Sequence, residues 1–456
     1  MSYRPPQKNP LILLSDGSWS GRERGAGSNV HQLANLVWGG AGLPNDDDFA
    51  HLHPSGKARY VNSVPVGSTF MDHLVRGLNV HDITHQCVDA YEYLVRGYTP
   101  QETEIWMFGV SKGAYIVRAV AGMINNCGIV KPVYQSNGDV DEEKTHQLCQ
   151  EVYRIYQCPS EPNAPKSEKS RDFRRKNSWA LIGDGDVIES PVRFMGVFDT
   201  VGKRGIPEFA DSLGIDWPKL YDQHVSSVVS DVYHAVSLHD RLYAFQPCLI
   251  SRDTEYGPSY GITERWFPGT HYDICRQQFK FVRGILPRSL ESVLPAWAWT
   301  SKVIKPNEIL SDLVLKWMLE CIDTHDPSGF IIPKGNIYRE LDRLKKGILE
   351  GQSTGDGDVY NRILQFAPFG QYLDLALSVA FGKWQNTQLY QLLFACRPRS
   401  IPEFNASVYN YRGPDPNLDG NIIQKLANLS SSSTPTEEQA NTRYPATSYD
   451  GWLLRR

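Results

Sequence analysis

Short apolar runs that end in polar turns recur along the first 270 residues of the chain. Three of them, Leu11–Leu14, Glu104–Phe108 and Val192–Phe198, are too short for helices and do not alternate between apolar and polar positions. Such runs predict strands that are buried on both faces of a parallel sheet. Weaker strands are predicted at Ala58–Val64 and at Arg265–Phe267, each followed by residues that favour turns.

Between these strands the apolar positions recur with helical spacing. Helices are predicted at Asn29–Val37, Val80–Tyr93 and Ala114–Ile124, and a further helix at Val228–Leu242. Strands that alternate with helices predict an α/β fold with a mostly parallel central sheet flanked by helices. In open sheets of this kind the functional residues follow the carboxyl ends of the strands.

The remaining third of the chain has a different pattern. Ile309–Ile322 predicts a strongly amphipathic helix and Tyr372–Phe381 predicts another, so a helical C-terminal extension or cap is expected. A stretch rich in Pro, Ser and charge predicts a mobile surface insertion, and a low-complexity polar segment predicts a tail without fixed structure. The expected organisation is a catalytic core (1–299) with an insertion (160–178), a helical extension (300–428) and a polar tail (429–456).

Composition narrows the class of protein. Of 456 residues 41% are hydrophobic, and the formal net charge of −4 gives no electrostatic reason to expect a nucleic-acid partner. The eight cysteines contain no C-x-x-C pair, so neither a zinc site nor a disulfide framework is expected. Neither a signal peptide nor a membrane-spanning run is found, which predicts a cytoplasmic location, with peripheral membrane contact left open.

The most informative motif is Gly109-Val110-Ser111-Lys112-Gly113, which matches G-x-S-x-G between a predicted strand and a predicted helix. This context is that of a nucleophile elbow, in which a sharp turn lifts a serine hydroxyl above the sheet of an α/β-hydrolase. Glycines two residues before and after the serine leave room for the turn. The alternative is a glycine-rich turn in which Ser111 only caps the helix.

A serine hydroxyl needs a base to remove its proton, and the base needs an acid to orient it. In α/β-hydrolases the chain order is serine, acid, histidine. Asp199 is the preferred acid because it alone directly follows a convincing buried strand. The aspartates considered after the serine include Asp184, Asp186, Asp199, Asp222 and Asp231.

His271 is the preferred base because it lies in a loop just beyond the last predicted strand. Asp273, two residues later, either supports that loop or replaces Asp199 as the orienting acid. The other histidines that follow Asp199 fall in less suitable contexts, and two of them lie in the predicted helix 228–242. These are His224, His234, His239 and His325.

The oxyanion hole is expected to use the backbone N–H of Lys112, which follows the nucleophile, and a second N–H from an early strand-to-helix loop. Asp16-Gly17-Ser18 is such a loop, and Gly17 allows close approach of the backbone. A carboxylate beside an oxyanion is repulsive unless loop amides or a cation bind it. Asp16 is therefore expected either to organise the turn or to border the site.

Several segments occur in an order that resembles the uncharacterised α/β-hydrolase family known as "domain of unknown function 2235", whose relatives include phospholipase effectors of bacterial type VI secretion. The resemblance implies Ser111 as nucleophile, Asp199 as acid and His271 as base, with the Asp16-Gly17 loop beside the active site. The segments are LLSDGSW (13–19), FGVSKGAYIVRAVAGMI (108–124), GVFDTVG (196–202), WFPGTHYD (266–273) and LSDLVLKWMLE (310–320).

Two departures from that family are visible. Lys112 stands where an arginine is usual, which is harmless if only its backbone is used. Residues 274–278, ICRQQ, replace a usual glycine run, so the loop after His271 is expected to have a different shape and to alter the substrate pocket. Cys275 within it is interpreted as a packing residue.

The leading hypothesis is a serine hydrolase that cleaves a lipid or small acyl ester through an acyl-enzyme, without a cofactor or metal. A thioesterase or transacylase with the same triad, and a non-catalytic binding module on a hydrolase fold, are the alternatives. A nucleotide-binding enzyme is disfavoured because neither common phosphate-binding glycine motif occurs. No specific protein partner is inferred.

Overall fold

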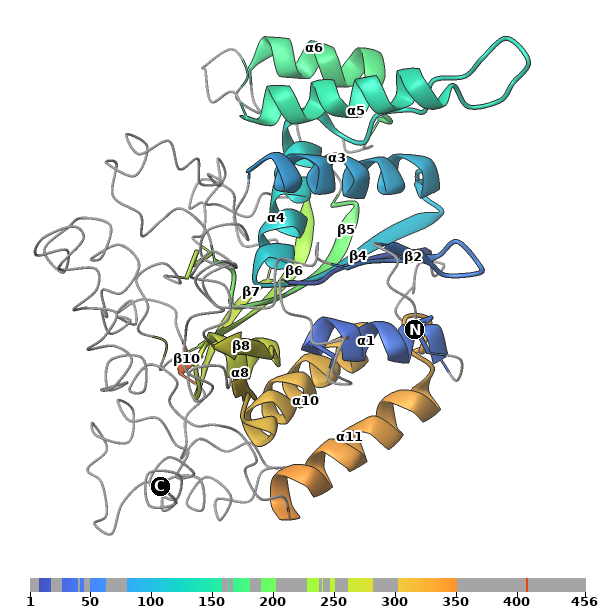
Figure 1. Ribbon diagram of the computed structural model, residues 1–456. Helices are drawn as coiled ribbons and strands as arrows, with labels where there is room; N and C mark the ends of the chain where they lie inside the picture. The colour runs from blue at the N-terminus through green and yellow to red at the C-terminus, as the bar shows by residue number, and fades with distance from the viewer. Residues whose placement is uncertain are drawn as a thin grey trace, which may run out of the picture.

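An eight-stranded sheet forms the centre of the computed structural model, with the strand order β10-β7-β6-β5-β4-β1-β3-β2. All neighbouring strands run parallel except β2, which pairs antiparallel with β3. Helices cover both faces of the sheet (Figure 1). The structure describes residues 8–17, 27–39, 42–44, 50–62, 80–157, 163, 167–180, 190–201, 228–237, 240, 247–250, 261–281, 302–350 and 407–408.

The elements have the following bounds. The sheet strands are β1 (Asn9–Ser15), β2 (Ala50–Leu52), β3 (Ala58–Val61), β4 (Thr103–Val110), β5 (Val192–Phe198), β6 (Val229–Ser237), β7 (Gly261–Phe267) and β10 (Ser407–Val408), and β8 (Phe279–Phe281) pairs with β9 (Lys302–Ile304). The helices are α1 (Asn29–Trp38), α3 (Val80–Gly97), α4 (Lys112–Cys127), α5 (Glu142–Gln157), α6 (Glu168–Asn177), α8 (His271–Cys275), α10 (Glu308–His325) and α11 (Lys334–Glu350).

The central strands are apolar on both faces because each face packs against helices. In β1, Ile12 and Leu14 join the core beneath α1, α10 and α11, whereas Leu11 and Leu13 join the core beneath α3, α4 and α5. Side chains alternate between the two faces of a strand, so a continuous apolar run is needed when both faces are covered. Figure 1 shows these two helical layers on opposite sides of the sheet.

The strand order creates a topological switch point. From β1 the chain continues to β3 on one side and later to β4 on the other, so β1 and β4 flank a topological switch point. Ser15 lies opposite Gly109 in the paired strands, and Val110 lies opposite Phe198 of β5. The turns after β1, β4 and β5 therefore leave the same edge side by side, which is where open α/β sheets bind ligands.

The predicted α/β class is confirmed, and the early elements agree closely with their expected positions. The strand over Val192–Phe198 has the predicted bounds, and those near Leu11 and Glu104 extend one to two residues further at their ends. The predicted helices at Asn29–Val37 and Ala114–Ile124 are α1 and α4.

The helix predicted at Val228–Leu242 is wrong, because residues 229–237 form β6 in the middle of the sheet. The apolar positions Val229, Val232 and Val236 recur at intervals that suit a helix. Valine is nevertheless better suited to a strand, and pairing with β5 and β7 supplies hydrogen bonds on both sides.

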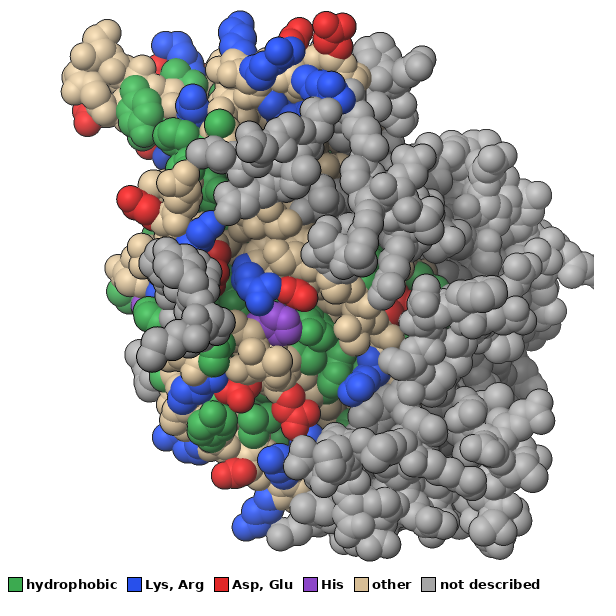
Figure 2. Space-filling model, turned by 180° about the vertical axis from the view of Figure 1, so that it is seen from behind, with side chains coloured by type: hydrophobic (Ala, Val, Ile, Leu, Met, Phe, Trp, Pro, Cys, Tyr) green, Lys and Arg blue, Asp and Glu red, His purple; other side chains and the backbone are tan. Residues whose placement is uncertain are grey.

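The loop expected over Ser160–Ser178 is helical in its second half. Ser167 caps α6 by accepting a hydrogen bond from the Ser170 amide at 3.1 Å. Arg174 of the basic run donates to the carbonyl of Asn126 at 2.7 Å, near the carboxyl end of α4, where a cation is favourable. Other basic residues of α6 stay exposed and lie at the α5 and α6 end of the molecule, where Figure 2 shows several Lys and Arg side chains.

The helix predicted at Ile309–Ile322 is α10, but it is buried on nearly every side rather than amphipathic. It packs on the sheet while α11 covers its outer side, so polar side chains such as Lys316 are buried as well. Within the described part of the chain, no helix has the length and apolar character needed to cross a membrane. The second predicted helix, Tyr372–Phe381, and the polar tail after 428 lie outside the described residues.

Asn29 joins three elements on the lower face of the sheet. Its fully buried side chain donates to the carbonyls of Ile274 in α8, at 2.8 Å, and of Ser311 in α10, at 3.3 Å. Its oxygen accepts a hydrogen bond from Arg276 Nε at 3.0 Å. One asparagine thus fixes the segment after His271 against α1 and α10.

We predict that Asn29→Ala lowers the free energy of unfolding by about 1–3 kcal/mol, because it leaves buried carbonyl groups without their donor. Urea unfolding followed by circular dichroism measures this effect. Asn137→Ala, in an exposed turn, is the control and should change stability little. Equal stability of the two variants would contradict this role of Asn29.

Candidate active site

Ser111 occupies the sharp turn between β4 and α4. Its backbone has φ 56° and ψ −115°, a conformation that non-glycine residues adopt only under constraint. A Cβ on Gly113 would lie 2.0 Å from the carbonyl oxygen of Ser15, and one on Gly109 would lie 2.5 Å from the carbonyl oxygen of Gly113. The two glycines of the motif are therefore required by close backbone contacts, as the sequence suggested.

The Ser111 side chain is hydrogen bonded to a histidine that follows strand β7. His271 Nε2 lies 2.9 Å from Ser111 Oγ, and His271 Nδ1 lies 2.7 Å from Asp199 Oδ2. All three side chains are fully buried. The three residues thus come from the turns after β4, β5 and β7 and form one continuous chain of hydrogen bonds.

Asp199 accepts hydrogen bonds from Ser237 as well. Its Oδ1 accepts the backbone N–H of Ser237 at 2.9 Å, and its Oδ2 accepts the Ser237 hydroxyl at 3.1 Å. Asp199 has φ 40°, so its backbone is also left-handed. Donors from Ser237 compensate the carboxylate for the water that it has lost.

His271 begins the short helix α8, and two aspartates hold it in place. The His271 backbone N–H donates to Asp240 Oδ2 at 2.9 Å. Asp273 accepts from the Thr270 amide at 2.8 Å and from the Asn307 amide at 2.7 Å. Of the two acids considered from the sequence, the structure gives Asp199 the hydrogen bond to the imidazole, and it uses Asp273 to cap α8 and join it to α10.

Asp16 is buried in the turn after β1, and its carboxylate has donors. Oδ1 accepts the Gly17 amide at 2.7 Å and Oδ2 accepts the Tyr60 hydroxyl at 2.5 Å. A loop amide and a hydroxyl thus supply donors to this buried carboxylate. These contacts also direct the Gly17 N–H toward Asp16, and Ser18, the third residue of the predicted loop, lies outside the described residues.

Lys112 is the first residue of α4 and is almost fully buried. The amide groups of a first helical turn lack partners within the helix and carry a partial positive charge. The predicted position of this N–H, directly after Ser111 at the helix start, therefore suits stabilisation of a negative oxygen.

Three residues around the site were missed from sequence: Ser237, Asp240 and Gln277. Ser237 ends β6, and recognition of that strand would have identified it, since residues at strand ends gather at this edge. Asp240 follows the same strand. Gln277 is fully buried behind α8, and a Cβ on Gly17 would lie 2.8 Å from its Nε2.

The histidine His234, which the sequence put in a helix, lies in β6 and serves a structural network. Its Nδ1 lies 3.1 Å from Glu264 Oε2, and its Nε2 accepts the Thr200 amide at 3.3 Å. Because Nε2 accepts, the proton lies on Nδ1 and is donated to Glu264. This network supports the backbone just after Asp199.

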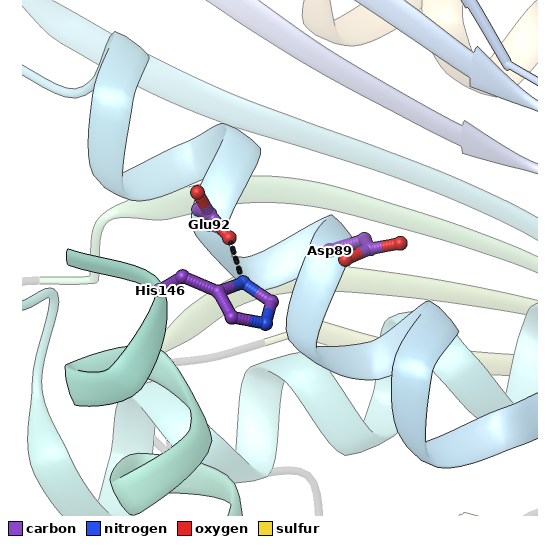
Figure 3. A group of neighbouring side chains, drawn as sticks. All are labelled: Asp89, Glu92 and His146. Carbon is purple, nitrogen blue, oxygen red and sulfur yellow. Dashed lines mark hydrogen bonds and ion pairs between the residues drawn. The ribbon is translucent and has the colours of Figure 1, made fainter. Parts of the chain in front are cut away.

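A separate group of side chains joins α3 to α5, on the other face of the sheet (Figure 3). Asp89, Glu92 and His146 offer atoms that lie within 4.8 Å of one another, a set that suits a divalent cation by type. His146 Nδ1 lies 2.7 Å from Glu92 Oε2, and Arg96 Nε donates to Glu92 Oε1 at 3.1 Å. Burial raises the pKa of Asp89. Through its contacts with His146 and Arg96, Glu92 is the centre of an ion-pair network between α3 and α5.

The parallel sheet, its switch point and the strand-turn-helix at Ser111 define an α/β hydrolase-like protein. The chain belongs to the family described as "T6SS, Phospholipase effector Tle1-like, catalytic domain", whose model matches residues 9–321. This match supports the relation to type VI secretion phospholipase effectors and indicates a hydrolase. It does not confirm the expected family name "domain of unknown function 2235". The matched range spans every element that surrounds Ser111, from β1 to α10.

Two further proteins are similar to this chain. The chain is 25% identical over 253 residues to "Uncharacterized protein YEL023C" of Saccharomyces cerevisiae, covering 54% of this chain and 33% of that protein. It therefore spans about a third of the length of that relative. A crystal structure of an uncharacterised protein from Pseudomonas aeruginosa matches with a TM-score of 0.35 and 15% identity, over 87% of this chain and 57% of the other. A likeness at that TM-score does not bear on function.

Gly17→Ala should lower the free energy of unfolding by about 1–3 kcal/mol, as overpacking of a filled site does. Its methyl group would lie 2.8 Å from the carbonyl oxygen of Val110, which belongs to the central strand β4 and cannot move away. Gly335→Ala is the matched control, because a Cβ there meets nothing within 4 Å. Urea unfolding of both variants checks the prediction, and equal stability would contradict the close approach of Gly17.

Proposed function

We propose that this chain is a serine hydrolase that cleaves a carboxylic ester of a lipid through an acyl-enzyme formed on Ser111. The observation that supports the proposal is the buried chain of hydrogen bonds from Asp199 through His271 to Ser111, at 2.7 and 2.9 Å. A nucleophile, a base and an orienting acid within hydrogen-bond reach are the arrangement that acyl transfer needs. The strained turn at Ser111 adds support, because strain of this kind clusters at active sites.

In the acylation step Ser111 Oγ attacks the ester carbonyl carbon while His271 Nε2 takes the hydroxyl proton. The carbonyl oxygen becomes an oxyanion beside the start of α4. The imidazolium then gives its proton to the departing alcohol as the carbon–oxygen bond of the ester breaks. Asp199 orients the ring and stabilises its charge throughout, because its Oδ2 faces His271 Nδ1.

In the deacylation step the same groups act on water. His271 removes a proton as the water oxygen attacks the acyl carbon, and it returns the proton to Ser111 Oγ when the acyl–enzyme bond breaks. A free carboxylic acid leaves. Full burial of all three side chains strengthens these electrostatic interactions, since they act away from bulk water.

The proposed substrate class is phospholipid, and the support for it is the family. Fold alone does not identify a substrate, because the walls of the pocket decide which ester fits. The family description names phospholipase effectors, and its model covers residues 9–321. Hydrolysis of one acyl ester of a phospholipid would release a fatty acid and leave a lysophospholipid.

We expect a fluorophosphonate probe to label the wild-type protein once, and Ser111→Ala to remain unlabelled at equal concentration and time. The probe reacts only with an activated serine, so it does not require knowledge of the substrate. Intact-mass spectrometry reports the adduct. Labelling of the variant would assign the reactive group elsewhere, and no labelling of either protein would favour a non-catalytic binding module.

The same pair of proteins tests the substrate. Wild-type protein incubated with phosphatidylcholine vesicles should release fatty acid and lysophospholipid, whereas Ser111→Ala should release neither. An acyl-thioester and an added acyl-accepting alcohol serve as competing substrates in parallel reactions. Faster cleavage of the thioester would identify a thioesterase, and acyl transfer to the alcohol a transacylase.

Asp199→Asn should slow turnover by roughly three to four orders of magnitude, because the amide holds the imidazole in the wrong tautomer. Asp273→Asn is the comparison, since Asp273 caps α8 and bonds to Asn307 instead. That variant should lose stability to urea while keeping most of its turnover. Near-wild-type turnover by Asp199→Asn would remove Asp199 from the triad.

A further inference from the structure

Ser237 is the last residue of the central strand β6 and lies beside the turn after β5. Its side chain is fully buried. The two strands pair in parallel up to their ends, with Phe198 opposite Ala235, and the Asp199 backbone N–H donates to the Ala235 carbonyl at 2.7 Å. The main chain of Asp199 is therefore fixed to β6 two residues before Ser237.

Both oxygens of the Asp199 carboxylate accept a hydrogen bond from this one serine. The Ser237 backbone N–H donates to Oδ1 at 2.9 Å, and the Ser237 hydroxyl donates to Oδ2 at 3.1 Å. The same Oδ2 lies 2.7 Å from His271 Nδ1. A serine hydroxyl has a single hydrogen, and here it is directed to the oxygen that also meets the imidazole.

The orientation of this carboxylate decides the orientation of the base. A carboxylate rotates readily about its terminal bond, because that torsion has no sharp minima. Donors on both oxygens restrict the rotation. The His271 ring must in turn keep Nε2 directed at Ser111 Oγ, which lies 2.9 Å away, and the acid is the group that holds the ring in that position.

We infer that Ser237 is a positioning residue for acyl transfer, whose hydroxyl holds Asp199 Oδ2 in the orientation that directs His271 at Ser111. This inference rests on the proposed hydrolase function. The hydroxyl acts through Asp199, and a hydrogen bond to an ionised acceptor is among the stronger kinds. If the hydroxyl only compensated a buried charge, its loss would lower stability and leave the reactivity of Ser111 unchanged.

Ser237→Ala tests this role, because it removes the hydroxyl and keeps the backbone N–H that donates to Oδ1. We expect the rate constant of fluorophosphonate labelling to fall by about 10-fold or more, the factor that corresponds to one hydrogen bond to a charged group. Intact-mass spectra at timed intervals measure this rate. In ester hydrolysis kcat should fall by a similar factor, while KM stays within about threefold of wild type.

Ser178→Ala is the matched control. Ser178 is also buried, and its hydroxyl donates to the Cys127 carbonyl at the carboxyl end of α4, away from Ser111. Both variants lose one buried hydroxyl donor and should lose some thermal stability, but only Ser237→Ala should label slowly. Ser237→Thr retains the hydroxyl on a side chain that suits a strand, and it should label within about threefold of wild type.

Proton NMR provides a second readout that needs neither probe nor substrate. The proton between an imidazole Nδ1 and a carboxylate resonates far downfield of backbone amide protons, and its position depends on the geometry of that hydrogen bond. The resonance of His271 should therefore be lost or displaced in Ser237→Ala. In Ser178→Ala it should keep its wild-type position, because the contact between Asp199 and His271 is unchanged.

The inference is overturned if Ser237→Ala labels within about threefold of the wild-type rate, or if its downfield resonance keeps the wild-type position. It is also overturned if Ser237→Thr has the thermal midpoint of the wild type and labels as slowly as Ser237→Ala, since the hydroxyl would then not be the cause. Failure of the proposed function has a different outcome: the wild-type protein itself would take no label and hydrolyse no ester. In that case both proposals are wrong.

Discussion

The close approach of three backbone segments at the switch point is the constraint on which the site depends. The amino end of α4 lies against the end of β1 so tightly that Gly113 has no room for a side chain, and a Cβ on Gly17 would lie 2.8 Å from the carbonyl oxygen of Val110. This contact is compatible with the turn only if Ser111 adopts its left-handed backbone, at φ 56°. The packing of the parallel strands on both sides of β4 supplies the stability that such strain requires.

The second feature of the site is its set of buried carboxylates. Asp16, Asp199, Asp240 and Asp273 are all nearly or fully buried, and each accepts hydrogen bonds from named backbone or hydroxyl donors. Each carboxylate also accepts from a donor that is distant in sequence: Tyr60, Ser237, His271 and Asn307, respectively. A buried charge without donors would cost several kcal/mol, roughly as much as a domain's whole margin of stability. These aspartates therefore hold the loops around Ser111 in place.

The helices below the sheet connect the site to the rest of the fold. Asn29 in α1, Arg276 after α8 and Asp312 in α10 form one hydrogen-bonded group. This group fixes the turn that carries both the His271 helix and Gln277. The family match ends at residue 321, within α10, and α10 packs against the sheet rather than apart from it. The helices α8 and α10 are thus part of the same hydrophobic core as the sheet.

The sequence by itself determined the features that depend on neighbouring residues. The strand-turn-helix around Ser111, the apolar runs of β1, β4 and β5, and the α/β class all follow from local pattern and turn chemistry. The residues that the sequence favoured, Asp199 and His271, lie in one hydrogen-bonded chain with Ser111, because strand ends gather at one edge of a parallel sheet. Local spacing failed at β6, where valines at helical intervals form a central strand, since only pairing with β5 and β7 favours the extended backbone. Tertiary structure alone decided that His271 bonds to Asp199 rather than to Asp273, that Tyr60 donates to Asp16 and that the backbone N–H of Asn307 donates to Asp273. Each of these depends on which atoms from distant segments come within hydrogen-bond distance, and no local pattern encodes that.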